Sequence, residues 1–294
     1  MNQPSPLASW NGEIMPLTEV RVPVLDRAFL FGDAIYEALR VYEGRPFLVD
    51  EHMARLRRSL DQIRIEADVD RIERRLFELL ERHPVRSGLV YLQVTRGVAP
   101  RTHYFPANPT EPNELIYVSP LDDDPHARHR ETGVDVITFD DLRWKRCDIK
   151  SVNLLANCMA AQAAREAGCA EAILVAADGA ITEGSHTSVF GVRDGAVMTA
   201  PLARNILPGI TRSLVVELAD RAGIPIREEP LSRDRLSEVD ELFLTGTTAE
   251  VLPVTRVDDQ PIGSGQPGEV TRQIAAAYRG HVADWLAGAP APAR

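Results

Sequence analysis

The segment LRWKRCDIKSVNLL, residues 142–155, contains both lysines of the chain, Lys145 and Lys150. The sequence has 33 lysine and arginine residues in total, so arginine supplies nearly every other cation. Arginine can replace lysine on a solvated surface, but it cannot form a Schiff base with an aldehyde and does not lose its proton in proteins. Two lysines so close together therefore indicate a position at which amine chemistry is required.

Lys150 is the better candidate of the two. The residues after it read as a helix that is capped by Ser151 and runs to about Ala167. The positive end of a helix disfavours an ammonium ion, which favours a nucleophilic amine at the residue just before it. Lys145 lies between two arginines and precedes no such helix.

Length and composition narrow the class of protein. The 294 residues are enough for one large domain or two smaller ones, and 44% hydrophobic with 26% charged residues is ordinary for a globular chain. A net charge of −10 without a long basic run disfavours nucleic acid and anionic membranes as partners. No apolar run is long enough to cross a bilayer, and the N-terminus lacks the basic and apolar regions of a secretion signal.

The cysteines point to a reducing compartment. There are three of them, an odd number, and none forms a C-x-x-C pair. Neither paired cysteines nor an H-E-x-x-H motif offers metal ligands. We therefore expect a cytoplasmic protein with buried free thiols and without a metal site.

Hydrophobic patterning predicts an α+β chain of two domains. Apolar residues at helical spacing predict helices over 51–64, 71–82 and 211–222. Runs rich in Val, Ile and Leu predict strands at 89–95, 114–119, 134–139, 172–175, 189–192 and 242–244. Trp10-Asn11-Gly12 predicts an early hairpin turn. The polar, proline-flanked segment 120–125 predicts a small N-terminal domain over 1–120, a linker over 121–130 and a larger domain over 131–294.

One glycine motif is a misleading match. Residues 263–268 read Gly-Ser-Gly-Gln-Pro-Gly and fit the G-x-G-x-x-G pattern of dinucleotide-binding loops. That pattern needs a strand before it and a helix and a further strand after it, and too few residues follow Gly268 for such a unit. We therefore predict a plain turn, and a nicotinamide-dependent oxidoreductase would rest on this motif alone.

Several segments together resemble the class IV aminotransferases, which are enzymes of fold type IV that use pyridoxal 5′-phosphate (PLP). Within that family the chain most resembles the bacterial D-amino acid aminotransferases. The resemblance implies an α+β fold of two domains with PLP between them, and a homodimer. The matching segments cover nearly the whole chain: RAFLFGDAIYEAL (27–39), EHMARL (51–56), VTRGVAPRTHYFP (94–106), LRWKRCDIKSVNLL (142–155), ITEGSHTSVFGV (181–192), ILPGITR (206–212) and ELFLTGTTAEVLPV (241–254).

The resemblance also implies roles for individual residues. Lys150 would form the internal aldimine with PLP, and Glu183 would pair with the pyridine nitrogen and keep it protonated, so that the ring stabilises a carbanion. The residues at 209–211 open a predicted helix, whose N–H groups can point at a phosphate. The implied contacts to the cofactor, besides Lys150 and Glu183, are Arg55, Leu207, Ile210, Thr211, Thr247 and Thr248.

Tyr36, Arg101 and His103 would bind the substrate carboxylate, because arginine offers a bidentate fork and the other two each donate one hydrogen bond. The Arg-x-His pair is the main reason to favour D-amino acids. Two departures bear on this interpretation. Gly246 stands where these enzymes usually have serine and branched-chain aminotransferases commonly have glycine. Residues 186–188, His-Thr-Ser, replace a run usually made of Ser and Asn.

The predicted reaction is a ping-pong transfer of an amino group between a D-amino acid, such as D-alanine, and a 2-oxo acid, either 2-oxoglutarate or pyruvate, with Lys150 moving the α-proton. A branched-chain L-amino acid aminotransferase of the same fold is the main alternative, which Gly246 favours. An aminodeoxychorismate lyase and a non-catalytic PLP-binding protein are further alternatives. A non-catalytic protein would not need both Lys150 and Glu183.

Overall fold

The computed structural model describes residues 6–121 and 124–288 of the chain. It separates into two compact units. Unit 1 comprises Met1–Asp123 and Ile149–Asn153, and unit 2 comprises Asp124–Asp148 and Leu154–Arg294. The chain therefore passes between the units three times, and a short segment from the middle of the sequence completes unit 1.

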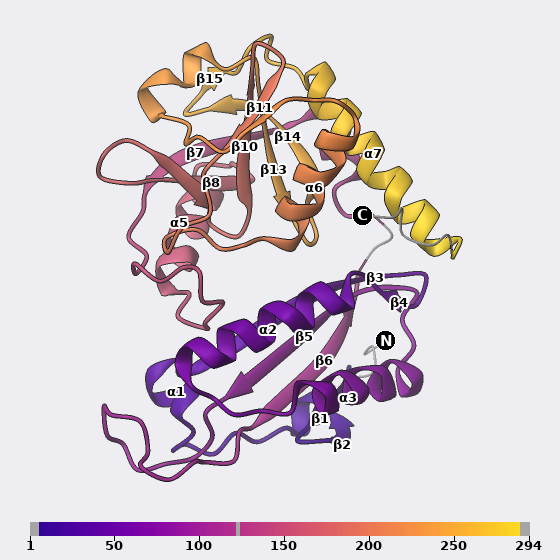
Figure 1. Cartoon of the computed structure of the whole chain (residues 1–294), viewed down its shortest axis with the longest axis vertical. Helices are drawn as coiled ribbons and strands as arrows, with labels where there is room; N and C mark the ends of the chain where they lie inside the picture. The colour runs from indigo at the N-terminus through magenta and orange to yellow at the C-terminus, as the bar shows by residue number, and fades with distance from the viewer. Residues whose placement is uncertain (1–5, 122–123, 289–294) are drawn as a thin grey trace. The chain divides into compact units, whose positions relative to one another are not determined.

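Unit 1 is built on a six-stranded antiparallel sheet of order β2-β1-β6-β5-β3-β4 (Figure 1). Its first hairpin turns at Asn11 and Gly12, with φ of 52° and 92°, which confirms the predicted turn. The strands are β1 (Leu7–Trp10), β2 (Glu13–Pro16), β3 (Ala34–Tyr42), β4 (Arg45–Pro46), β5 (Ser87–Thr95) and β6 (Glu114–Pro120). The α-helices are α1 (Arg27–Phe31), α2 (Val49–Ile63) and α3 (Val69–Arg82).

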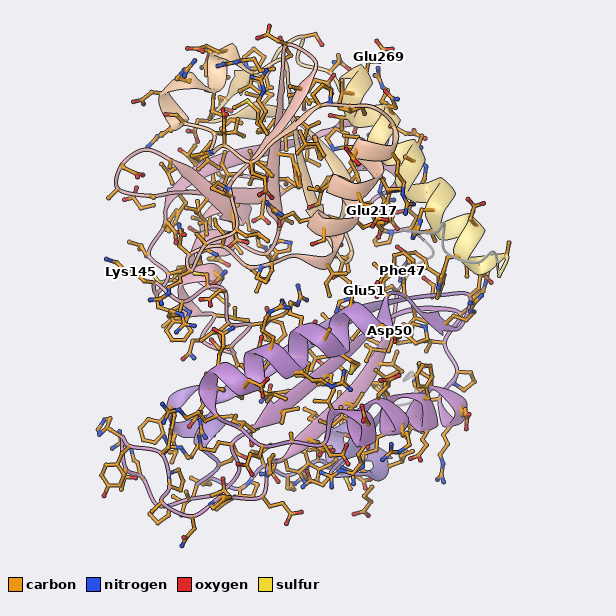
Figure 2. All side chains as sticks on the ribbon, in the orientation of Figure 1. Phe47, Asp50, Glu51, Lys145, Glu217 and Glu269 are labelled. Atoms are coloured by element: carbon orange, nitrogen blue, oxygen red, sulfur yellow. The ribbon has the colours of Figure 1, made fainter. Side chains whose placement is uncertain are left out.

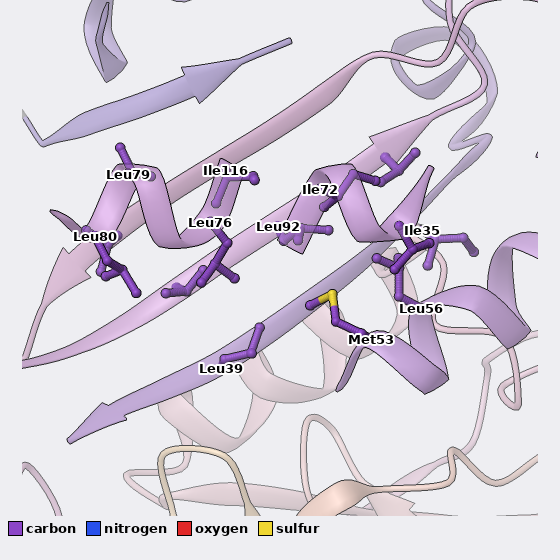
Figure 3. Packing of buried hydrophobic residues seen from close by; sticks show 14 of the residues in the cluster. Ile35, Leu39, Met53, Leu56, Ile72, Leu76, Leu79, Leu80, Leu92 and Ile116 are labelled. Atoms are coloured by element: carbon purple, nitrogen blue, oxygen red, sulfur yellow. The ribbon is translucent and has the colours of Figure 1, made fainter. Parts of the chain in front are cut away.

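Helices α2 and α3 form because apolar residues recur on one side of each and pack on the sheet. Figure 3 shows Met53 and Leu56 of α2 and Leu76 of α3 near Ile35 and Leu92 of the sheet, and all five are at most 1% exposed. Burial of one such side chain contributes about 1.5–3 kcal/mol, so this core accounts for much of the stability of unit 1. The predictions of helices over 51–64 and 71–82 are confirmed.

Unit 2 is built on a nine-stranded mixed sheet of order β12-β11-β10-β13-β14-β7-β8-β9, with β15 beside β14 (Figure 1). The strands are β7 (Val134–Asp140), β8 (Glu171–Val175), β9 (Ile181–Gly184), β10 (Ser188–Arg193), β11 (Ala196–Thr199), β12 (Ile226–Arg227), β13 (Glu241–Gly246), β14 (Glu250–Val257) and β15 (Gln260–Pro261). The α-helices are α4 (Ala127–Thr132), α5 (Leu155–Glu166), α6 (Ile210–Arg221) and α7 (Glu269–Leu286).

Strand β8 is buried on both faces. Ala172 and Leu174 pack in a small cluster with α5, whereas Ile173 and Val175 belong to the larger core of the unit. Because successive side chains of a strand point to opposite faces, α5 covers one face of β8 and the larger core lies on the other. Helices α6 and α7 pack against one another and against β13.

One predicted helix begins later than the sequence indicated. Helix α5 starts at Leu155, so Ser151 does not cap it. Ser151 instead forms a β-bridge with Ile35 of β3, and this tertiary pairing takes the segment out of the helix. The helix-end argument for Lys150 over Lys145 was therefore wrong.

The segment predicted as a linker, residues 121–130, contains the start of α4 (Ala127–Thr132). Residues 122 and 123 lie outside the described part of the chain. In the parts of the chain that are described, no helix is long and apolar enough to cross a membrane.

The glycine motif at 263–268 lies directly before α7, a helix that the sequence reading did not predict. The carboxylate of Glu241 occupies the N-terminus of this helix. It accepts hydrogen bonds from Val270 N at 3.0 Å, Thr271 N at 2.7 Å and the Thr271 hydroxyl at 2.6 Å. A side chain at Gly268 would clash with that carboxylate. The helix end that a dinucleotide phosphate would need is thus occupied by Glu241, and the oxidoreductase alternative loses its support.

Candidate active site

Lys150 lies in unit 1 beside strand β3. Its backbone oxygen accepts a hydrogen bond from Tyr36 N at 3.0 Å, and its Nζ atom lies 4.2 Å from the centroid of the Tyr36 ring. The Tyr36 ring stacks on Tyr91 of β5, with 5.8 Å between centroids. Lys150 is half-buried, whereas Lys145 is exposed (Figure 2). Two of the residues predicted for the site, Lys150 and Tyr36, are therefore in direct contact.

Arg55, a predicted cofactor ligand, is buried on α2. It donates twice to the carboxylate of Glu37, from Nε to Oε1 at 2.8 Å and from Nη2 to Oε2 at 2.7 Å. Nδ1 of His52 lies 2.7 Å from the same Oε2 atom. Residues three positions apart share one face of a helix, so α2 presents His52 and Arg55 together to the fully buried Glu37 of β3.

Burial and charge act in opposite directions on this cluster. Burial alone would raise the pKa of Glu37, but the Arg55 guanidinium and the His52 ring hold that pKa well below its usual range. Burial also lowers the pKa of His52, against the opposing effect of Glu37. Glu37 is therefore an anion paired with Arg55. His52 is neutral, and its Nδ1–H donates to Glu37.

Arg101 and His103 meet at the ring of Phe31, the last residue of α1. The Arg101 guanidinium lies 5.2 Å from the centroid of the Phe31 ring, and the His103 ring centroid lies 5.6 Å from it. Both side chains are exposed. The loop after β5 thus gathers a guanidinium and an imidazole on one aromatic ring, where both can donate hydrogen bonds to an anion.

In unit 2, Glu183 lies buried on β9 and pairs with Arg143. Nη1 of Arg143 donates to Glu183 Oε2 at 2.6 Å, while Nε and Nη2 donate to the two oxygens of Asp141 at 2.9 and 2.8 Å. The Thr182 hydroxyl also donates to Asp141, at 2.7 Å. Burial alone would raise the pKa of Asp141, but Arg143 lowers it below its ordinary value. The carboxylate predicted to meet the pyridine nitrogen is thus held by an arginine to which the sequence reading gave no role.

The turn that follows Glu183 is organised by a second buried carboxylate, Glu171. Its oxygens accept hydrogen bonds from Ser185 N at 3.1 Å, Ser185 Oγ at 2.5 Å and Thr187 Oγ1 at 3.0 Å. Nδ1 of His186 lies 3.0 Å from Glu171 Oε2. Burial alone would raise the pKa of Glu171, but His186 and the other donors lower it. His186 and Thr187, which depart from the D-amino acid pattern, are thus both bound to Glu171.

Helix α6 presents an N-terminus that no side chain caps within the described residues. Its cap residue is Gly209. A Cβ there would lie 3.0 Å from Ser188 Oγ and 3.2 Å from Arg212 Cβ, which leaves little room for a side chain. Thr211 adds a buried hydroxyl in the first turn. Unlike α7, whose N-terminus holds Glu241, this helix end can bind an anion.

The other predicted phosphate contacts lie at the start of α6 or directly after β13, a strand that packs against α6. Leu207 precedes the cap residue, and Ile210 is the first residue of α6. Thr247 and Thr248 directly follow β13, which packs against α6. The buried hydroxyl of Thr245 on β13 has no hydrogen-bond partner among the described residues, which is uncommon and fits a place beside a polar ligand.

Comparisons with known proteins show the family of the chain. The sequence profile described as amino-transferase class IV matches residues 34–257. The chain belongs to the class IV aminotransferases. Among the relatives of this class IV aminotransferase, the D-alanine aminotransferase of Bacillus licheniformis is 42% identical over 93% of this chain and 96% of its own. The D-alanine aminotransferase of Staphylococcus aureus (strain N315) is 38% identical over 92% of this chain and 96% of its own length.

Solved structures show the same fold. The branched-chain amino acid aminotransferase of Escherichia coli has a TM-score of 0.86 and 29% identity, covering 94% of each chain. A second branched-chain amino acid aminotransferase, solved with pyridoxamine 5′-phosphate, has a TM-score of 0.84 and 27% identity, covering 98% of this chain and 96% of its own. The resemblance read from the sequence, and the α+β fold of type IV, are therefore confirmed.

This class IV aminotransferase is a PLP-dependent enzyme whose substrates are amino acids and 2-oxo acids. The described residues fit PLP on two counts. The uncapped N-terminus of α6, with threonines on the adjoining elements, can take a phosphate. Lys150, half-buried against Tyr36, offers an amine to an aldehyde.

The sequence reading missed Glu37, Asp141 and Arg143. Glu37 and Arg143 pair with Arg55 and Glu183, which were predicted for the site, but these two pairings join different elements and leave no local pattern. Asp141 pairs with Arg143, two residues along the chain. One signal was available for Glu37. It is an acidic residue inside a strand of mostly buried residues, and a buried carboxylate requires a cationic partner.

Proposed function

We propose that this enzyme transfers the amino group of a D-amino acid, such as D-alanine, to a 2-oxo acid, either 2-oxoglutarate or pyruvate. The observation that carries the proposal is the 42% identity, over 93% of the chain, to a D-alanine aminotransferase. Arg101 and His103 at the Phe31 ring support it, because they offer donors for a carboxylate. Amino acids and 2-oxo acids share that carboxylate, so one set of residues serves both halves of the reaction.

PLP supplies an aldehyde carbon that takes the substrate amine and a ring that accepts the electrons released with the α-proton. In this proposal Lys150 binds the cofactor through Nζ. The same Nζ atom would act as the base that moves the α-proton of the substrate. The Tyr36 ring, 4.2 Å from Nζ, limits where that amine can move. Glu183 would accept a hydrogen bond from the protonated ring nitrogen and so favour the protonated ring.

The phosphate of PLP carries charge that suits a helix N-terminus and a guanidinium. Arg55 can serve because Glu37 fixes its side chain while the guanidinium keeps its charge. The proposed phosphate ligands are Arg55, Leu207, Ile210, Thr211, Thr247 and Thr248.

The absorption spectrum of the PLP-loaded protein tests the substrate class. With no 2-oxo acid present, D-alanine should convert the visible band of bound PLP to the band of the amine form, and L-leucine should not. Conversion by L-leucine alone would remove the proposed roles of Arg101 and His103 and favour the branched-chain alternative. Turnover of Lys150→Ala at the wild-type rate would show that the Lys150 assignment is wrong.

Borohydride reduction tests the lysine directly, because it fixes PLP covalently to the amine that holds it. The chain has only Lys145 and Lys150, so peptide mass spectrometry separates the two outcomes. We expect the label on Lys150, and no loss of label in a Lys145→Arg control. A label confined to Lys145 would contradict the proposal.

A branched-chain L-amino acid aminotransferase is the second candidate, and Gly246 is the observation that favours it. A Cβ at Gly246 would make ordinary contacts only, 3.4 Å to Thr187 Cγ2 and 3.8 Å to Ala249 Cβ. Neither packing nor backbone conformation therefore requires glycine at this position. Gly246 is thus available for a role in substrate choice. The branched-chain enzymes that match in structure are 27–29% identical to this chain, below the 42% of the D-alanine enzyme.

We also propose that the enzyme is a cytoplasmic homodimer. The segments 22–29 and 98–105 adjoin through a bridge between Asp26 and Val98, and both expose large apolar side chains. Such a set is typical of a surface that another protein covers. All three cysteines are free, which suits a reducing compartment. The expectation that all three thiols are buried was wrong, because only Cys147 is buried and Cys158 is exposed. The exposed side chains, here called the apolar patch, are Val22, Val24, Leu25, Phe29, Val98, Tyr104 and Phe105.

A further inference from the structure

Three buried side chains of unit 2 form a connected row. Arg143 lies in the middle, with its side chain 8% exposed, and the side chains of Asp141 and Glu183 are 10% and 5% exposed. The guanidinium makes a bidentate pair with Asp141 and turns its remaining nitrogen, Nη1, to Glu183 Oε2 at 2.6 Å. An arginine fork of this kind fixes the direction of both carboxylates, because its donors lie in one rigid plane.

The guanidinium in the middle of this row stays charged although it is buried. Burial alone would lower the pKa of Arg143, but the two carboxylates raise it above its ordinary value, so the guanidinium keeps its charge. A buried carboxylate is stable as an anion when a cation is nearby, and Arg143 supplies a cation to both Asp141 and Glu183.

We propose that Arg143 is a positioning residue for the cofactor-binding carboxylate: it orients Glu183 and keeps it ionised toward the ring nitrogen of PLP, and Asp141 holds Arg143 in place. The inference rests on the proposed role of Glu183. A carboxylate has two oxygens and can accept several donors, so Arg143 at Oε2 and a ring N–H can be bound together. The Thr182 hydroxyl, which donates to Asp141 at 2.7 Å, extends the same row to the residue beside Glu183.

The neighbouring sequence offers a matched control. Arg146 pairs with Asp148 in the same way that Arg143 pairs with Asp141, through Nε at 2.9 Å and Nη2 at 3.0 Å. The Arg146 side chain is 37% exposed, and Asp148 lies two residues away from it, as Asp141 does from Arg143. Arg146→Gln therefore removes a similar ion pair without touching the Asp141–Arg143–Glu183 row.

The experiment measures the affinity of the apo full-length protein for PLP and for its carbocyclic analogue, in which CH replaces the ring nitrogen. Hydrogen bonds to charged groups contribute enough that Arg143→Gln should weaken PLP binding about tenfold or more. The same variant should leave binding of the analogue almost unchanged, since the analogue has no ring nitrogen for Glu183 to meet. Arg143→Lys should recover part of the loss, and Arg146→Gln should bind both compounds like the wild type.

The outcomes separate this inference from the proposed function. Equal weakening for PLP and for the analogue would show that Arg143 acts only on folding, and wild-type affinity for PLP would show that it has no role at Glu183. Either result overturns the inference, while a wild-type protein that still reacts with D-alanine leaves the proposed function standing. If Arg143→Gln does not fold, Arg143→Lys and Asp141→Asn are compared in the same way. A smaller loss of affinity that is again confined to PLP supports the inference. An equal loss of affinity for PLP and for the analogue overturns it.

Discussion

The buried carboxylate of Glu37 is held by two side chains of one helix. Its neighbours differ in charge, because a guanidinium is always charged in proteins, whereas burial lowers the pKa of the His52 imidazole. An ionised group in such a place depends on its partners, since water does not reach it. The consequences for stability can be measured one residue at a time.

Replacing Glu37 with glutamine should destabilise the fold strongly. The change leaves the Arg55 guanidinium buried without its counter-charge, and breaking a buried pair in this way costs about 3–5 kcal/mol. Urea denaturation of the full chain measures the free energy of unfolding. Glu43→Gln is the control, because its ion pair with Arg86 is exposed and should matter little. Equal effects of the two variants would contradict the assigned role of Glu37.

His52 should make stability depend on pH in a defined window. Its pKa in the folded protein lies below the ordinary value of 6.5, so the unfolded chain binds the proton more readily. Stability should therefore fall as pH decreases below about 6.5, by at most about 1.4 kcal/mol per pH unit from this residue. Denaturation at several pH values should show a shallower fall for His52→Gln than for the wild type. His129→Gln, an exposed change, should leave the slope as it is.

Among the elements, helix α7 has its N-terminus capped by the carboxylate of Glu241, which lies on strand β13. Glu241→Ala removes three hydrogen bonds at that helix end, and a lost helix cap costs about 0.5–2 kcal/mol. We expect a lower thermal midpoint for this variant and faster amide hydrogen exchange in α7. Glu269→Ala, an exposed change in the first turn of the same helix, is the control. Unchanged exchange in α7 would show that Glu241 does not anchor the helix.

The elements also show what the sequence could and could not reveal. Helices α2 and α3 were predictable because Leu56 and Leu76 recur with their neighbours at helical spacing, which is local information. The start of α5 was not, because Ser151 pairs with Ile35 far along the chain and a local capping signal cannot show that. The same limit applies to the site: residues in quoted motifs, such as Lys150, were found, while pairings across elements were not.

For the molecule as a whole, the apolar patch should decide the oligomeric state. Phe29 is 71% exposed within that patch, so Phe29→Glu should place a charge in the proposed interface and shift the protein from dimer to monomer. Sedimentation velocity measures the two species. Phe77→Glu, at a residue 41% exposed on α3, should remain dimeric. A dimeric Phe29→Glu protein would show that the patch is not the interface.

The segment Ile149–Asn153 belongs to unit 1, although its neighbours on both sides belong to unit 2. A chimera that exchanged everything before residue 124 with a homologue would join the β3 of one parent to the lysine segment of the other. The hydrogen bond from Tyr36 N to Lys150 O would then join residues from two parents that did not evolve together. Recombination between members of this family should therefore move residues 149–153 with the N-terminal part, as one inherited block.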